Sequence, residues 1–99
     1  MEHIETNPQT IEKVSQLFKV LSDGTRLQIL LLLSKGEANV SKIAESLAME
    51  QSTVSHQLKL LKLNHVVRSR KAGKSVFYAL DDEHVVDILM QTFQHVCHS

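Results

Sequence analysis

The sequence predicts a mainly α-helical domain that carries a single β-hairpin. Two observations favour this class. Apolar residues recur at helical spacing over most of the chain, while two short segments, 66–70 and 75–80, are instead rich in β-branched and aromatic residues. The length of 99 residues is typical of one domain, residues 1–99. Because so short a chain buries only part of its apolar surface, we also expect a homodimer.

The first two helices are marked by the residues at their ends. Asn7 followed by Pro8 predicts the start of a helix whose apolar residues recur at helical spacing as far as Leu21. Residues 22–25 break this pattern, and a second helix is expected over 26–34. Five consecutive apolar residues in the second helix predict that it lies at the centre of the core.

Two further helices are expected in the middle of the chain, over 40–47 and 51–62, with a tight connection between them. The apolar residues of 51–62 lie on one stripe, and the opposite face is polar, basic and free of acidic residues. The hairpin follows, with its turn at 71–74 around Gly73. Two short helices joined by a tight turn and followed by a basic hairpin are the parts of a winged helix-turn-helix.

The formal net charge is zero, but the charges are distributed unevenly. Residues 51–80 contain six Lys and Arg and no Asp or Glu, whereas residues 81–99 contain four acidic residues and no Lys or Arg. In a winged helix-turn-helix, polar side chains early in the second helix reach base edges, and Lys and Arg neutralise phosphates. We therefore expect double-stranded DNA as a partner, contacted by Gln51, Ser52, Thr53, Ser55, His56, Lys59, Arg70, Lys71 and Lys74. The alternative is a helical protein whose basic face is only solvated.

Several functional classes are not expected. No apolar run approaches the ~20 residues of a membrane span, and the polar, acidic N-terminus does not resemble a signal peptide, so a cytoplasmic protein is expected. The single cysteine, Cys97, excludes an internal disulfide framework and a cysteine-cluster zinc site. A zinc enzyme needs an open coordination position and a general base, and the sequence identifies neither. We therefore expect no enzyme and no small organic substrate.

Helical spacing returns from Asp82 onward, and this last helix carries potential metal ligands at both ends. Asp82 and His84 lie at its start, and His95 and His98 lie near its end, roughly 16 Å away at ~1.5 Å per residue. One helix cannot bring both pairs to one ion, but the histidines share a stripe. An antiparallel copy of the helix would complete two sites of three imidazoles and one carboxylate, which suit tetrahedral zinc or cobalt. Alternatively, the histidines are ordinary surface residues, and the acidic residues only stabilise the helix start.

Three segments, 21–30, 51–61 and 78–82, resemble the ArsR/SmtB family of bacterial metal-sensing repressors. The resemblance implies a winged helix-turn-helix homodimer, formed through the first and last helices, that binds its operator without metal and releases it with metal. This release derepresses a metal-efflux gene. Asp82, His84, His95 and His98 match the ligand set of the zinc- and cobalt-sensing members. The resemblance further implies an allosteric relay in which the ring of His95 hydrogen-bonds toward the backbone of His65, after the DNA-reading helix.

Departures from the family pattern bear on the ligand. Arsenic-sensing relatives carry cysteines around the third helix, but residues 36–42 contain none, so arsenic is not expected. Nickel-sensing relatives carry more histidines after the last helix, so Zn(II) or Co(II) is preferred and Ni(II) is less expected. An alternative within the same fold is a regulator whose metal site is vestigial and which responds to redox state, through Cys97, or to another ligand.

Overall fold

A computed structural model describes residues 4–98, so residues 1–3 and Ser99 of the expected domain lie outside the described residues. Five helices and three strands follow one another in the order α1 (Pro8–Leu21), α2 (Gly24–Leu33), β1 (Ala38–Asn39), α3 (Val40–Leu47), α4 (Gln51–Leu63), β2 (Val67–Ala72), β3 (Ser75–Leu80) and α5 (Glu83–Cys97). Among the described residues, no helix combines the length and the apolar character that crossing a membrane requires.

Four of the five described helices begin with a side-chain cap. The side chains of Asn7, Asp23, Asn39 and Asp82 each accept a hydrogen bond from a backbone N–H in the first turn of α1, α2, α3 and α5, respectively. These bonds satisfy donors that have no partner within the helix. The exception is α4, whose N-cap residue, Glu50, makes no such bond with its side chain.

The core lies between α2, α3, α4 and the sheet. The largest side chains that are fully buried come from these helices and from the start of the hairpin: Ile29, Leu30, Ile43, Val54, Leu58, Leu61, Val66 and Val67. From α5, Leu89 joins this cluster. The buried residues of α4 are spaced at helical intervals, which confirms the predicted apolar stripe and turns the polar face of α4 outward.

The sheet has three antiparallel strands in the order β1-β3-β2. In the hairpin, Ala72 pairs with Ser75, and the two residues between them, Gly73 and Lys74, form the turn. Gly73 has φ of 63°, a left-handed conformation that glycine adopts without the steric cost of a Cβ atom. On the other side of β3, Ala38 pairs with Tyr78.

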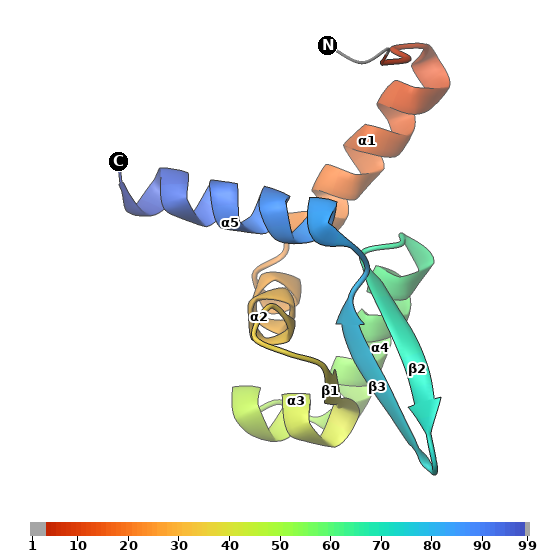
Figure 1. Cartoon of the computed structure of the whole chain (residues 1–99), viewed down its shortest axis with the longest axis vertical. Coiled ribbons are helices and arrows are strands. Elements are labelled where there is room, and N and C mark those ends of the chain that lie inside the picture. The colour runs from red at the N-terminus through yellow and green to blue at the C-terminus, as the bar shows by residue number, and fades with distance from the viewer. Residues whose placement is uncertain (1–3, 99) are drawn as a thin grey trace.

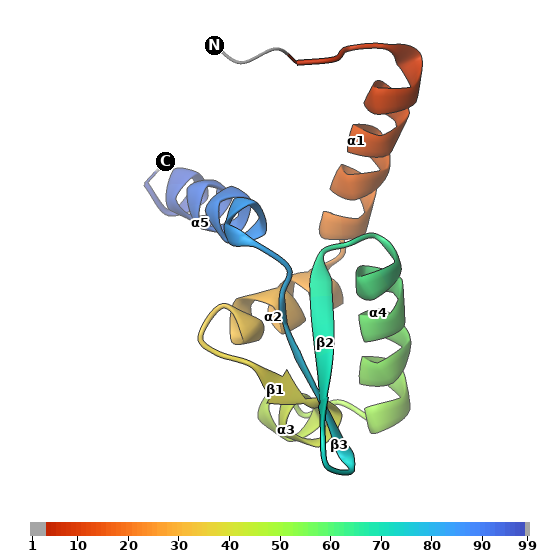
Figure 2. The ribbon, with the colours of Figure 1, turned by 45° about the vertical axis from the view of Figure 1, so that its right-hand side comes forward.

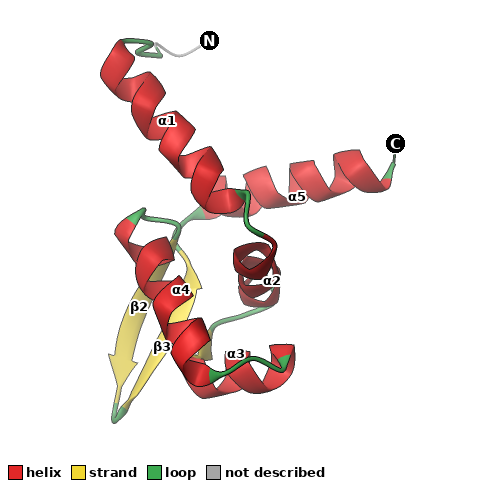
Figure 3. Cartoon of the chain, turned by 180° about the vertical axis from the view of Figure 1, so that it is seen from behind, coloured by secondary structure: helices red, strands yellow, loops and turns green. Residues whose placement is uncertain are grey.

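The elements form a body with two projecting helices. The body contains α2, α3, α4 and the sheet, and α1 and α5 extend away from it in different directions (Figures 1 and 3). The hairpin lies beside α4, and its turn lies at the same end of the body as α3 (Figures 1 and 2). The predicted winged helix-turn-helix is therefore confirmed, with the hairpin β2–β3 as the wing.

Three details differ from the sequence-based expectation. The second helix begins at Gly24 and not at the expected residue 26, because the side chain of Asp23 caps its start. Lys71 is not part of the turn, since it pairs with Val76 and prolongs β2 toward the wing tip. The strand β1 was not predicted, because its two residues, Ala38 and Asn39, are ordered by pairing with β3, far along the chain.

Candidate functional site

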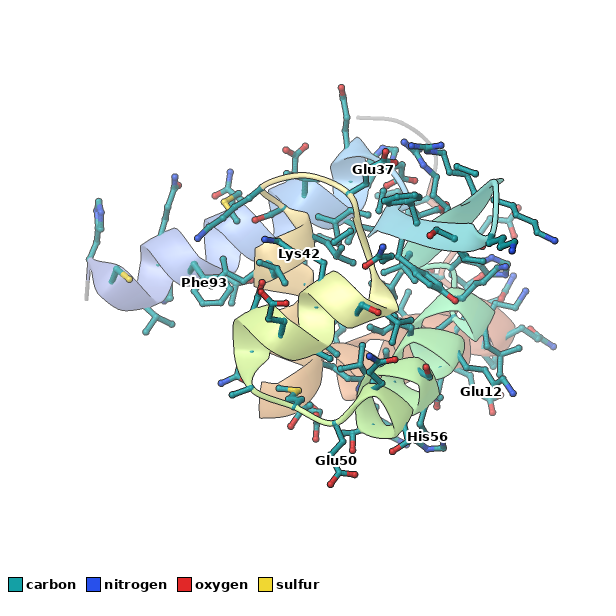
Figure 4. The ribbon with its side chains drawn as sticks, turned by 90° about the horizontal axis from the view of Figure 1, so that it is seen from below. Glu12, Glu37, Lys42, Glu50, His56 and Phe93 are labelled. Carbon is teal, nitrogen blue, oxygen red and sulfur yellow. The ribbon has the colours of Figure 1, made fainter. Side chains whose placement is uncertain are left out.

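The polar face of α4 presents most of the expected DNA-contacting residues to solvent. Gln51, Ser52, Thr53, Ser55, His56 and Lys59 are all exposed. Figure 4 shows His56 projecting outward from α4, away from α3. The amide of Gln51 donates to the hydroxyl of Ser41 in α3, over 3.4 Å, and so ties the start of α4 to its partner helix. The arrangement leaves a polar face of α4 open to solvent, as the predicted DNA contact requires.

The end of α4 is fixed by a left-handed turn. His65 has φ of 59°, its backbone N–H donates to the carbonyl of Lys62, and the N–H of Val66 donates to the carbonyl of Leu61. This pair of bonds is the Schellman motif, which usually employs glycine. His65 is exposed and connects α4 directly to the wing. The left-handed conformation is unusual for a residue with a side chain. A change of conformation at His65 would therefore alter how α4 is joined to the wing.

The wing carries free and paired basic residues. Lys71 and Lys74 are exposed, and neither takes part in an ion pair among the described residues. Arg70, another expected DNA contact, is instead paired within the protein. It lies within β2, and its guanidinium forms an ion pair with Glu37, which precedes β1. Sequence reasoning missed Glu37 because 33 positions separate the two residues.

Asp82 and His84, one pair of the expected metal ligands, lie side by side at the start of α5. One carboxylate oxygen of Asp82, Oδ1, accepts from the N–H of Val85 over 3.1 Å, and the other, Oδ2, lies 3.5 Å from Nδ1 of His84. The bond from Val85 lowers the pKa of Asp82, so its carboxylate is ionised at neutral pH. Two ligands at ~2.0–2.1 Å from a tetrahedral ion lie about 3.4 Å apart. The spacing of Oδ2 and Nδ1 fits such an ion.

His95 and His98 lie at the opposite end of α5. His95 is exposed in the last turn, and His98 is the C-cap residue. Between residues 4 and 98, no three His, Cys, Asp or Glu side chains of one chain are grouped closely enough to hold a metal. No hydrogen bond among these residues joins His95 to His65. The end of α5 also points away from the α4–β2 connection (Figures 1 and 2). The structure therefore brings Asp82 and His84 together and places His95 and His98 at the opposite end of α5.

An apolar groove runs between α1, α2 and α5. It has a volume of about 400 Å³ and is lined by Phe18, Leu21, Ser22, Leu27, Ile88, Leu89, Thr92, Phe93 and Val96. Phe18 is 59% exposed, which is unusual for a large aromatic side chain. Ile88 and Thr92 belong to the stripe of α5 that also carries His84 and His95. The expected ligand pairs thus flank the face of α5 that borders this groove.

Comparison with known proteins identifies a family. The sequence profile described as "Bacterial regulatory protein, arsR family" matches residues 23–68. The cadmium resistance transcriptional regulatory protein CadC homolog of Staphylococcus aureus is 43% identical over 90 residues, which cover 90% of this chain and 72% of that protein. The HTH-type transcriptional regulator NmtR of Mycobacterium tuberculosis is 38% identical over 90 residues, which cover 91% of this chain and 75% of that protein.

A solved structure supports the same relationship. A homodimeric winged helix-turn-helix DNA-binding domain from Mycobacterium bovis superposes with a TM-score of 0.83 at 30% identity, covering 98% of this chain and 91% of that one. The CadC homolog and NmtR are transcriptional regulators and not enzymes, which agrees with the expectation for this chain. By sequence and by fold, the chain belongs to the arsR family of bacterial regulatory proteins.

Proposed function

We propose that the chain is a homodimeric, metal-responsive repressor that acts in the cytoplasm. The metal-free dimer binds operator DNA, and Zn(II) or Co(II), bound between the subunits, releases it and derepresses a metal-efflux gene. One observation carries this proposal: the Asp82–His84 half-site has ligand spacing, and the remaining ligands, His95 and His98, lie at the other end of the same helix. A second copy of α5, running antiparallel, would supply the missing pair at each end.

The apolar groove supports a dimer formed through α1 and α5. Besides Phe18, α1 exposes Ile11 and Val14, and α5 exposes Val96. Covering this surface with a second copy would stabilise the assembly through burial of apolar area, at about 25 cal/mol per Å². The related Mycobacterium bovis domain is homodimeric, and the CadC homolog is named for cadmium resistance, which agrees with a dimeric, metal-responsive protein.

The ligand set favours a regulatory site over a catalytic one. Three imidazoles and one carboxylate complete a tetrahedral shell, so no position remains open for a substrate. Zn(II) and Co(II) accept this geometry, whereas Ni(II) usually takes square-planar or octahedral shells and is less favoured. When bound, the ion would supply a rigid cross-link between the two copies of α5. Asp82 retains one oxygen for this role, because only Oδ1 is used to cap the helix.

DNA binding is assigned to the face of α4 and to the wing. Gln51, Ser52, Thr53, Ser55 and His56 would reach base edges in the major groove, and Lys59, Lys71 and Lys74 would contact phosphates. A two-fold dimer predicts half-sites separated by roughly one helical turn, 34–36 Å, on a pseudo-palindromic operator. Because the binding energy comes largely from phosphate contacts, affinity must fall steeply with salt concentration.

The metal signal must travel from α5 to α4. In the proposed relay, a metal-bound His95 donates from its other ring nitrogen toward the backbone of His65 in the second subunit, because the end of α5 points away from the α4–β2 connection of its own chain (Figures 1 and 2). The left-handed conformation of His65 makes it a suitable receiver, because a new hydrogen bond there would change the connection between α4 and the wing. The coupling free energy would be on the order of 1–3 kcal/mol, and DNA must weaken metal binding by the same factor.

The proposal is tested by titrating zinc into the dimer bound to a fluorescent operator duplex and following anisotropy. The wild-type protein should release DNA at one or two zinc ions per dimer, and His84→Ala and His95→Ala should retain DNA binding but lose the zinc response. Release that persists in both variants would place the sensor elsewhere. No release in the wild type would contradict the metal-responsive mechanism.

A second candidate function keeps the DNA reader but replaces the metal signal by oxidation. The observation that favours it is Cys97, a free and exposed thiol in the last turn of α5. Cys97 lies two residues after His95 and so faces away from the histidine stripe on a regular helix; its oxidation would act on the end of α5 and not directly on the proposed metal ligands. In that case, Cys97→Ser would abolish a peroxide-dependent release of DNA, while His95→Ala would leave it intact.

A further inference from the structure

One edge of the Arg70 guanidinium is bound by a carboxylate from outside the wing. Its Nε donates to Oε2 of Glu37 over 2.9 Å, and its Nη2 bonds to the other carboxylate oxygen of the same residue. Phe77 pairs with Arg70 across the hairpin, and the centroid of its ring lies 5.0 Å from the guanidinium carbon of Arg70. A bidentate carboxylate on one edge and an aromatic face below hold Arg70 in a single orientation.

Glu37 reaches Arg70 because of the order of the strands. It directly precedes β1, which pairs with β3, and β3 lies between β1 and β2. Figure 4 shows Glu37 at the sheet, on the α2–β1 connection. This carboxylate is therefore brought to a hairpin that contains no acidic residue of its own, and it lies with Arg68, Ser69 and Arg70 around a small depression of about 90 Å³.

Both members of the pair are charged and accessible. The hydrogen bond from Arg70 lowers the pKa of Glu37, and the bond to Glu37 raises the pKa of Arg70, so both remain ionised at neutral pH. The side chain of Arg70 is 56% exposed, and that of Glu37 is 40% exposed. The pair is thus open to solvent, but its net charge is zero. Lys71, the next residue, has no such acidic partner between residues 4 and 98.

We propose that Glu37 is an affinity-setting residue that competes with a DNA phosphate for Arg70. A carboxylate and a phosphate present similar pairs of oxygens to the fork of a guanidinium, so each can occupy the same donors. In the free protein, Glu37 holds these donors and repels an approaching phosphate. This inference rests on the proposed DNA binding, and it adds a residue outside α4 and the wing to the determinants of affinity.

The test is a double-substitution cycle on the full-length chain, with a mixed-sequence 30-bp DNA duplex as the probe. Glu37→Gln should tighten binding about 3- to 10-fold near 0.1 M salt and steepen the dependence of log affinity on log salt by about 0.9 per subunit, as expected for one added phosphate contact. Arg70→Gln should weaken binding less than about twofold in the wild-type background. In the Glu37→Gln background, it should remove the whole gain.

Two controls separate competition from a general effect of charge. Glu50 is also exposed, at the start of α4, and has no basic partner in the described part of the chain, so Glu50→Gln should leave the cost of Arg70→Gln unchanged. Lys71→Gln should cost the same with and without Glu37. Equal costs of Arg70→Gln in both backgrounds, or weaker binding by Glu37→Gln, would overturn the inference. A wild-type protein that does not bind the duplex would instead overturn the proposed function and the competition with it.

Discussion

Arg26 in α2 donates a hydrogen bond of 3.1 Å from Nη1 to the side-chain oxygen of Gln57 in α4. The same guanidinium donates from Nε to the backbone carbonyl of Val20, in the last turn of α1, over 2.7 Å. Carbonyls in the last turn of a helix lack an intrahelical donor, so Arg26 completes α1 while it holds α4. One half-buried side chain therefore links a helix of the proposed dimer interface to the DNA-reading helix.

Replacing Gln57 should affect DNA recognition more than folding. Gln57→Leu keeps the volume but removes the acceptor for Arg26, and Gln57→Glu keeps an acceptor. We expect Gln57→Leu to lower the ratio of the affinity for operator DNA to the affinity for mixed-sequence DNA about tenfold. This factor corresponds to the free energy of one half-buried hydrogen bond to a charged group. Gln57→Glu should retain this ratio. The operator for the measurement is the duplex that the wild type selects from a random library, and equal losses in both variants would contradict a positioning role for this bond.

The buried stripe of α4 should dominate stability. Leu58 is fully buried, whereas Leu63, in the same helix, is 75% exposed. Leu58→Ala should lower the free energy of unfolding by about 2–5 kcal/mol, because it leaves a cavity in the core. Leu63→Ala should change it by less than about 0.5 kcal/mol. Urea denaturation followed by circular dichroism makes the comparison, and similar losses in both variants would show that α4 packs differently.

Asp82 has two separable roles, capping α5 and binding the metal. Asn is as good an N-cap residue as Asp, so Asp82→Asn should preserve the thermal unfolding midpoint while it weakens zinc binding more than about tenfold. Asp82→Ala should lower both, because neither the acceptor for Val85 nor the ligand remains. Calorimetric zinc titration and thermal melts of the metal-free variants are the measurements. Full zinc affinity in Asp82→Asn would remove Asp82 from the ligand set.

The apolar groove should be required for dimer formation. Phe18→Asp places a charge on the exposed ring position that borders the groove and should convert the dimer into a monomer in sedimentation velocity. Val76 is a matched control, since it is an exposed apolar residue that pairs with Lys71 next to the turn of the wing. This turn lies at the opposite end of the body from α1 and α5 (Figure 1). Val76→Asp should remain a dimer. A dimer that tolerates Phe18→Asp would require an interface outside the groove.

Local sequence patterns predicted most of the fold, because helices and a hairpin depend on residues close along the chain. Asn7 and Pro8 mark the start of α1, and Gly73 marks the turn of the wing, as the structure confirms. The start of α2 was placed too late because Gly24 is a poor helix former, and the preceding cap, Asp23, outweighs this disadvantage.

Contacts between residues far apart along the chain could not be predicted from such local patterns. The strand β1 depends on a partner near Tyr78, and Arg70 and Arg26 find their partners 33 and 31 residues away, respectively. No periodicity in the sequence connects such positions. For the candidate site, spacing along α5 predicted which ligands share a stripe, and the structure adds the 3.5 Å contact between Asp82 and His84. The pairing of the two ends of α5 across a dimer stays a prediction.

The central claim, a metal site shared between subunits, is tested most directly by mixing two defective proteins. His84→Ala and His95→Ala each damage both sites of their own homodimer. In a mixed dimer of the two variants, one site contains both substitutions. The other site takes an intact Asp82–His84 pair from the His95→Ala subunit and an intact His95–His98 pair from the His84→Ala subunit.

The measurement is zinc-dependent release of a fluorescent operator duplex after the two variants are unfolded together and refolded at equal concentration. The account predicts that neither variant alone responds and that the mixture does, with up to half of the dimers binding one zinc ion each. A mixture as unresponsive as its components, when sedimentation shows that dimers have formed, would contradict a site shared between subunits.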